Sequence, residues 1–183
     1  VVARDVPSSQ AEVGARTVTA YAVTSGTVAK FTTSGFTTAT NGSSALSGTP
    51  PICFSTELFG VVYFADGTNE KKWTASTNTV AAWSASAGSL PTSGSNKPRL
   101  IETWRSRVVV SGISGDPHNW FMSKVGDATD WDYSPSTVVA TQAVAGNNTD
   151  AGKSADVING MCPYSDDILI FFGDHSIHQM TGD

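Results

Sequence analysis

Charged residues are scarce in this sequence, and acids outnumber bases. Only 15% of the 183 residues are charged, with 11 Lys and Arg against 16 Asp and Glu, whereas a typical domain has roughly 25%. This balance excludes a nucleic-acid-binding protein that works through a basic face, because too few cations are present. Runs of Ala, Glu, Lys and Leu are also missing, which excludes a coiled coil or helical bundle. No apolar run approaches the roughly 18 residues of a membrane-spanning helix.

Cysteine is nearly absent as well. Cys53 and Cys162 are the only two, and their spacing fits no zinc-binding pattern, which requires pairs a few residues apart. Each lies beside an apolar segment, so both are predicted to be buried thiols. No local feature supports a long-range disulfide between them. Reducing surroundings during assembly are therefore expected.

Small hydroxyl residues and glycine are abundant instead, with 23 Ser, 22 Thr and 17 Gly. The short apolar segments between them are rich in β-branched and aromatic residues, which is typical of strands. We therefore expect an all-β protein. Residues 138–157 are predicted to be a long loop with one short strand, because Gly146-Asn147-Asn148 interrupts their weak helical character. The expected strands span residues 17–23, 27–31, 58–64, 107–110 and 168–172.

The chain is predicted to divide into a short arm and one domain. Residues 1–14 are polar and without periodicity, so they are expected to be an N-terminal arm or linker. They do not have the charged start and apolar core of a signal peptide. Residues 15–183 have a length typical of one domain, and their pattern of hairpins indicates its architecture.

Four apolar strands are each followed by a glycine-centred turn and a second strand with an aromatic residue or Met. The turn glycines are predicted to supply the positive φ of tight hairpins, and they are 41, 48 and 58 residues apart. Hairpins at such intervals are typical of propeller blades, which stack to bury both faces. Residues 15–183 are therefore expected to form a β-propeller-like domain of about three to four blades, the last one truncated. The turn glycines are Gly26, Gly67, Gly115 and Gly173.

Two segments carry a resemblance to a known family. Residues 99–134 combine a strand with basic residues, a Gly-Asp-Pro turn, an aromatic strand that ends in Ser123, and a later Gly-Asp with Asp-Trp. Residues 166–183 hold an apolar strand followed by Ser-Ile and a terminal Thr-Gly-Asp. Together they resemble the β-propeller structural proteins of tailed bacteriophages, of the tail nozzle or tail-hub type. Members of that family are generally much longer than this chain.

The resemblance implies a non-enzymatic virion structural protein, placed in the nozzle, hub or connector of the tail around the DNA exit channel. Its implied partners are other copies of itself in a ring, neighbouring tail or connector proteins, and tail fibres. The genome would pass through the channel without specific binding, and no membrane is implied. The net charge of −5 suits this interpretation, because an acidic lumen repels DNA. Assembly is expected in the host cytoplasm and the final location in the phage tail.

The tryptophans leave a second function open. They are predicted to fill the space between blades, where each buries a large area, but they could also form a platform on which sugars stack. The alternative function is therefore a glycan-binding β-propeller or adhesin domain involved in host attachment. The tryptophans are Trp73, Trp83, Trp104, Trp120 and Trp131.

Three carboxylates lie close together at Asp127, Asp130 and Asp132. Oxygen ligands at this density suit Ca²⁺, although the spacing differs from that of an EF-hand loop and no bidentate Glu follows. The competing interpretation is a turn whose Asp side chains accept hydrogen bonds from their own backbone. Whether they bind an ion is left open, and no metal site is assigned.

His175 and His178 follow Asp174, and this combination of residue types is found in zinc sites. Positions i and i+3 of a regular strand point to opposite faces, so the two rings cannot bind one ion from such a strand. We therefore interpret them as polar residues of a turn and a strand face. No cofactor is expected.

The sequence contains no recognisable catalytic constellation. Ser114 lacks the glycine register of a nucleophile elbow. Asp66-Gly67-Thr68, followed by Trp73, only echoes the Asp box of sialidase propellers. A propeller glycosidase or lyase with paired carboxylates is the third function considered, but the chain is predicted not to be an enzyme. The acids considered for such a pair are Glu12, Glu57, Glu70 and Glu102.

Overall fold

The computed structural model describes residues 2–5, 18–48 and 53–181. Its regular elements are strands, apart from η1 (Gly146–Asn148), a single turn of 3₁₀ helix. The prediction of an all-β fold is therefore confirmed for the described residues. No helix among them is long and apolar enough to cross a membrane.

Four antiparallel sheets follow one another along the chain. Each is a meander, in which strands that are neighbours in the sequence pair with each other. The exception is the third sheet, where β12 pairs with β14 because β13 belongs to a separate pair. Sheet 1 contains β1 (Val2–Asp5), β2 (Val18–Thr24), β3 (Thr27–Thr32) and β4 (Gly35–Thr38). Sheet 2 contains β5 (Phe54–Leu58), β6 (Val61–Ala65), β7 (Glu70–Thr74) and β8 (Thr79–Ala82). Sheet 3 contains β10 (Leu100–Trp104), β11 (Arg107–Ile113), β12 (Asp116–Met122) and β14 (Val144–Ala145). Sheet 4 contains β15 (Ile158–Ser165), β16 (Ile168–Gly173) and β17 (Ile177–Thr181), while β9 (Ala87–Gly88) and β13 (Asp130–Trp131) form a separate parallel pair.

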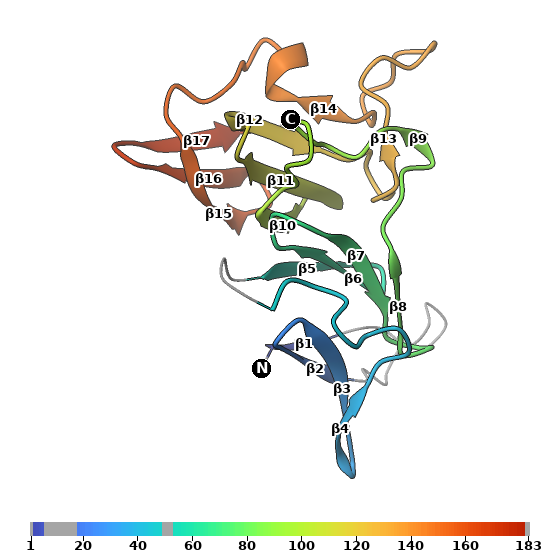
Figure 1. Cartoon of the computed structure of the whole chain (residues 1–183). Helices are drawn as coiled ribbons and strands as arrows, with labels where there is room; N and C mark the ends of the chain where they lie inside the picture. Colours follow the sequence, from blue (N-terminus) through green and yellow to red (C-terminus); the bar gives the residue numbers. More distant parts are fainter. Residues whose placement is uncertain (1, 6–17, 49–52, 182–183) are drawn as a thin grey trace.

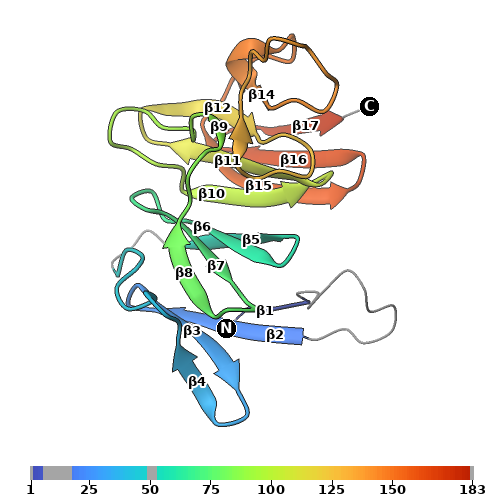
Figure 2. The same ribbon diagram turned by 90° about the vertical axis from the view of Figure 1, so that its right-hand side faces the viewer.

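The sheets are stacked in chain order. In Figure 1 sheet 1 lies at the bottom and sheet 4 at the upper left, and Figure 2 shows the same succession from the side. β10 contacts both β5 and β15, so the first strands of sheets 2, 3 and 4 lie side by side. The later strands β4, β8 and β14 lie at the periphery (Figure 1), so the stack opens like a fan.

Strand periodicity explains how a middle sheet packs on both sides. Val62 and Phe64 of β6 belong to the apolar cluster shared with sheet 1, while their neighbours Tyr63 and Ala65 belong to the cluster shared with sheet 3. Successive side chains of a strand point to opposite faces, so an unbroken apolar run is buried from both sides. Sheet 3 repeats this arrangement, with Val109 packed against sheet 4.

The apolar run at residues 58–64 does not form one strand, contrary to the prediction. A two-residue turn divides it between β5 and β6, and in this turn Phe59 and Gly60 adopt φ values of 50° and 81°. Left-handed pairs of this kind match the twist of the flanking strands, as in type I′ hairpins. The same type of pair joins β2 to β3 at Ser25-Gly26 and β10 to β11 at Arg105-Ser106. The sequence pattern did not reveal the turn at Phe59-Gly60, because Phe rarely adopts a left-handed backbone conformation.

Replacing Phe59 by Asn is expected to stabilise the protein by about 0.5–1 kcal/mol. The Phe59 residue is 61% exposed on a left-handed backbone, so little packing is lost, and Asn adopts this conformation more easily. Urea denaturation measures the difference. Phe59→Ala is the matched control, because it removes the ring but keeps the strain. Equal stability of the Asn and Ala variants would contradict this explanation.

Two of the four predicted turn glycines have the expected positive φ, Gly26 at 75° and Gly67 at 81°. For Gly115 and Gly173 the prediction is wrong, because neither has a positive φ. At these two positions a larger residue is excluded because there is no space for a Cβ atom. A Cβ at Gly173 would lie 2.5 Å from a carboxylate oxygen of Asp156, and one at Gly115 would lie 2.2 Å from a serine hydroxyl. Both contacts come from residues distant in the sequence, so a repeat pattern does not reveal them.

The N-terminal segment contains a strand that the sequence analysis did not expect. Within the predicted arm of residues 1–14, Val2–Asp5 forms β1 and pairs with β2, and the rest of that range lies outside the described residues. Residues 138–157 form the expected loop, with β14 and η1 as its short elements.

Both cysteines are free thiols, but they differ in burial from the prediction. Cys53 is half-buried, and burial, together with the nearby charge of Asp66, raises its pKa to about 12. Cys162 is exposed on β15. Its neighbour Met161 packs toward sheet 3, so the side chain of Cys162 points to the other face.

Candidate functional site

The loop with three clustered carboxylates is a series of Asx turns. Asp127 Oδ1 accepts hydrogen bonds from the backbone N–H and the hydroxyl of Thr129, at 2.8 and 2.7 Å. Asp130 Oδ1 accepts one from the backbone N–H of Asp132 at 3.1 Å, and Asp132 Oδ1 accepts one from that of Ser134 at 2.9 Å. Each carboxylate organises its own backbone, so the turn interpretation explains this sequence pattern.

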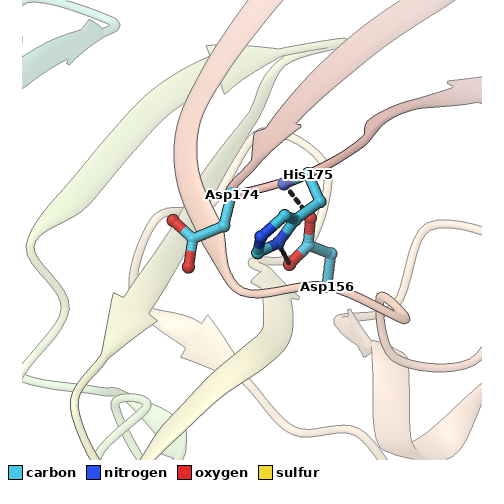
Figure 3. A group of neighbouring side chains, drawn as sticks. All are labelled: Asp156, Asp174 and His175. Atoms are coloured by element: carbon cyan, nitrogen blue, oxygen red, sulfur yellow. Dashed lines mark hydrogen bonds and ion pairs between the residues drawn. The ribbon is translucent and has the colours of Figure 1, made fainter.

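A different group of ligand-type side chains comes together beside sheet 4 (Figure 3). Asp156 precedes β15, while Asp174 and His175 lie in the turn between β16 and β17. One possible ligand atom of each lies within 4.8 Å of the other two. The sequence analysis missed Asp156 because it is 19 residues from His175 and belongs to no motif.

The carboxylate of Asp156 holds the β16–β17 turn. Its Oδ2 accepts hydrogen bonds from the backbone N–H of His175 at 2.6 Å and from the hydroxyl of Ser176 at 2.9 Å. Its Oδ1 accepts one from the backbone N–H of Val157 at 2.8 Å. These bonds, led by that from His175, lower the pKa of Asp156 to about 2 despite the opposing effect of burial. The carboxylate of Asp174 points away from this network (Figure 3), so the group is a brace for the turn.

One histidine lies in a turn and the other on a strand, as interpreted from the sequence, and both lie beside the network of Asp156 and Ser176. His175 lies in the turn with 90% of its side chain exposed, and its Nδ1 is 3.9 Å from Asp156 Oδ1. His178 lies on β17, where its Nε2 is 2.8 Å from the hydroxyl oxygen of Ser176.

Replacing Asp156 by Ala is expected to loosen the β16–β17 turn. The backbone N–H of His175 loses its acceptor, so its hydrogen exchange should become about tenfold faster. Exchange followed by NMR measures this rate. Asp174→Ala is the matched control, because that carboxylate points away from the amide (Figure 3). The same acceleration in both variants would contradict the role of Asp156.

The tryptophans are buried, with 5% or less of each residue exposed, so their predicted packing role is confirmed. Their indole N–H groups also attach loops to the sheets. Trp83 and Trp131 both donate to the backbone carbonyl of Ala128, each at 2.9 Å. Trp104 donates to the carbonyl of Ser165 at 3.0 Å. The five indoles are therefore not displayed together as an exposed stacking platform.

Asp66 is fully buried at the end of β6. Its Oδ1 accepts hydrogen bonds from the backbone N–H groups of Thr68 and Asn69, at 2.8 and 2.6 Å. Its Oδ2 accepts one from the backbone N–H of Ser47 at 2.7 Å and one from the side-chain amide of Asn69 at 2.9 Å. Although burial opposes ionisation, these bonds hold the pKa of Asp66 below its usual range. Asp66 thus joins the loop after sheet 1 to the β6–β7 turn.

Of the four glutamates considered for a catalytic carboxylate pair, those in the described part of the chain make different contacts. Glu70 forms an ion pair with Lys97 at 2.8 Å, and Glu57 accepts a backbone hydrogen bond within the β5–β6 turn. Glu102 is half-buried on β10, and Glu12 lies outside the described residues.

Two cavities of about 480 and 460 Å³ lie along β17, and Trp120, Met180 and Thr181 line both of them. The first cavity also contains Arg107. Its guanidinium donates to three backbone carbonyls at 2.6 to 3.2 Å, two of them within the loop of residues 138–157. Burial lowers the pKa of Arg107, and the charge of the neighbouring Arg105 adds to this effect. Arg107 therefore anchors the loop to sheet 3.

The two ends of the stack present apolar sheet faces. On sheet 1, Phe31 and Phe36 are 52% and 49% exposed, and their ring centroids lie 5.3 Å apart in an edge-to-face contact. On sheet 4, Tyr164, Phe172 and Ile177 are 72%, 41% and 70% exposed. Exposed apolar groups gathered on one face are typical of interaction surfaces.

The polar clusters described above all brace turns or loops, so the best candidate sites are surfaces. The two end faces are the strongest of these, because the faces between the sheets are covered by apolar clusters. A scan of the chain against known protein families and a search of curated proteins found no match.

Proposed function

We propose that this chain is a non-enzymatic structural component of a bacteriophage tail, part of a propeller-like ring in the nozzle, hub or connector. The observation that carries the proposal is the fan of stacked antiparallel sheets (Figure 1). Sheets that need neighbours on both faces are the structural logic of propeller blades. The resemblance of residues 99–134 and 166–183 to phage tail proteins supplies the biological setting.

In this proposal the first strands of sheets 2, 3 and 4 form part of the wall of the DNA channel. β5, β10 and β15 lie side by side, as the innermost strands of blades do. They contain Glu57 and Glu102 but no Lys or Arg. This part of the wall has acids and no bases, so it repels the phosphate backbone and lets DNA pass without binding.

The proposed role is mechanical. Apolar clusters fill the space between successive sheets, and close-packed interiors of this kind resist deformation. The loop of residues 138–157 projects from sheet 3, and its Val138 is 80% exposed. Loops of this kind are available to contact neighbouring tail proteins or fibres. The glycan-binding alternative loses its main support, because the tryptophans it needs are buried.

Electron microscopy of phage particles from the native source, with mass spectrometry of the same particles, tests this function. We expect the chain to be present in purified particles, with the stacked sheets fitting density in a ring of the tail. Absence of the chain from particles, together with recovery as dispersed small molecules, would reject the proposal. A glycan array would then test the alternative.

A further inference from the structure

Every interface between sheets inside the molecule joins two different kinds of face. Sheet 2 presents Phe64 toward sheet 1 and Tyr63 toward sheet 3, and sheet 3 presents Val108 toward sheet 2 and Val109 toward sheet 4. We call the face of a sheet that points toward the preceding sheet in chain order its earlier face, and the face that points toward the following sheet its later face. At each interface the later face of one sheet therefore meets the earlier face of the next. Within the described part of the chain, the earlier face of sheet 1 and the later face of sheet 4 are the two left without a sheet against them.

The later face of sheet 4 is uncharged at its centre. Cys162, Ile170 and Gln179 lie in register across its three strands, and Phe172 pairs with Ile177 beside them. The alternate residues of the same strands pack on sheet 3, so these five side chains point outward. None of them is a Lys, Arg, Asp or Glu.

On strands β2 to β4, the earlier face of sheet 1 is uncharged as well. Ala22, Ala29 and Thr38 lie in register, and Phe31 pairs with Phe36 beside them. The contact between the two phenylalanine rings already exists in the single molecule, so little side-chain freedom remains to be lost when the face is covered. This set again contains no charged residue.

We propose that the later face of sheet 4 in one copy packs on the earlier face of sheet 1 in the next copy. The contact continues the later-to-earlier order of the sheets inside the molecule, and it buries apolar surface without removing a charge from water. Because the two faces differ, the association is head to tail, and it closes into a ring when the rotation between copies allows. This inference rests on the proposed function, since it names the surfaces through which copies would join.

Cysteine cross-linking tests the contact directly. Native Cys162 is exposed on the later face, so Phe36→Cys places a second thiol on the earlier face of the same chain. Mild oxidation of this variant should give a ladder of dimers, trimers and larger species. Cys53 takes little part, because its pKa of about 12 keeps it protonated during the reaction. Thr37→Cys is the matched control, since this neighbour on β4 points to the opposite face of sheet 1, and it should give no ladder.

Sedimentation of variants with a charge on one face provides the second measurement. Ile177→Asp and Phe36→Asp each place a carboxylate in the proposed contact, so each should weaken self-association by about tenfold or more. Ile177 is 70% exposed and Phe36 49%, so the fold should tolerate the changes, which circular dichroism checks.

The outcomes separate this interface from the function on which it rests. A wild-type protein that stays monomeric at all concentrations, or a ladder that forms equally with Thr37→Cys, overturns the interface. Self-association that both charged variants leave unchanged overturns it as well. The presence of the chain in purified phage tails decides the proposed function independently of these results.

Discussion

Replacing Trp131 by Ala will destabilise the protein by about 3–5 kcal/mol, a large part of the roughly 5–15 kcal/mol by which domains are stable. Trp131 is 1% exposed in the cluster between sheets 2 and 3, and its ring centroid lies 5.8 Å from that of Trp83. The bulky neighbours cannot collapse into the space that the indole leaves. Thermal unfolding followed by circular dichroism should show a melting temperature about 10 °C lower.

Two further variants separate the parts of this effect. Trp131→Phe keeps most of the packing but loses the N–H group that donates to Ala128, and that carbonyl keeps its hydrogen bond from Trp83. Its expected cost is therefore only about 1 kcal/mol. Val138→Ala alters a residue that is 80% exposed and should leave stability unchanged. If Trp131→Ala unfolded at the same temperature as Val138→Ala, Trp131 would not belong to the core.

Replacing Asp66 by Asn will lower the free energy of unfolding by about 3 kcal/mol at neutral pH. The carboxylate accepts four hydrogen bonds in a buried position. In the variant, one oxygen can still accept from the backbone of Thr68 and Asn69. The new amide NH₂ faces the donors of Ser47 and Asn69, so these bonds are lost and donors oppose each other.

The effect of Asp66 on stability should also depend on pH. Its pKa is lower in the folded protein than in the unfolded chain, so its contribution is complete above the unfolded-state pKa of about 4. The contribution disappears as the pH falls through the lower, folded-state pKa. Between about pH 6 and 3, urea denaturation of wild type should show a loss of stability that is smaller in Asp66→Asn.

Asp150→Asn is the control for this measurement, because Asp150 is exposed and a surface change of this kind costs less than about 0.5 kcal/mol. Asp156 has a lowered pKa as well, but it is present in both proteins and cancels in the comparison. If the free energies of unfolding of wild type and Asp66→Asn fell in parallel as the pH was lowered, Asp66 would not be the group that causes the loss of stability.

Hairpins and the all-β class could be predicted from the sequence because they depend on neighbouring residues. The apolar run of residues 168–172 lies within β16, and Gly26 and Gly67 occupy left-handed turn positions, as predicted. The same local reasoning failed at Phe59, where an apolar residue occupies a turn. Propensity describes an average environment, and here the pairing of β5 with β6 outweighs it.

The candidate surfaces and clusters depend on residues far apart in the sequence. Asp156 reaches the turn at His175 across 19 residues, and Trp83 reaches Ala128 across 45. Such contacts leave no periodic trace, because they arise only when whole sheets stack.

The sequence by itself determined that the chain forms short strands, where four of the hairpins turn, and that strands such as β6 are apolar on both faces. Only the tertiary structure decided which faces meet. The faces with Phe64 and Tyr63 are covered by sheets 1 and 3, while those with Phe36 and Ile177 stay exposed at the ends of the stack. The physical reason is that alternation at period 2 specifies two faces for every strand, but burial depends on which other sheet arrives to cover each one.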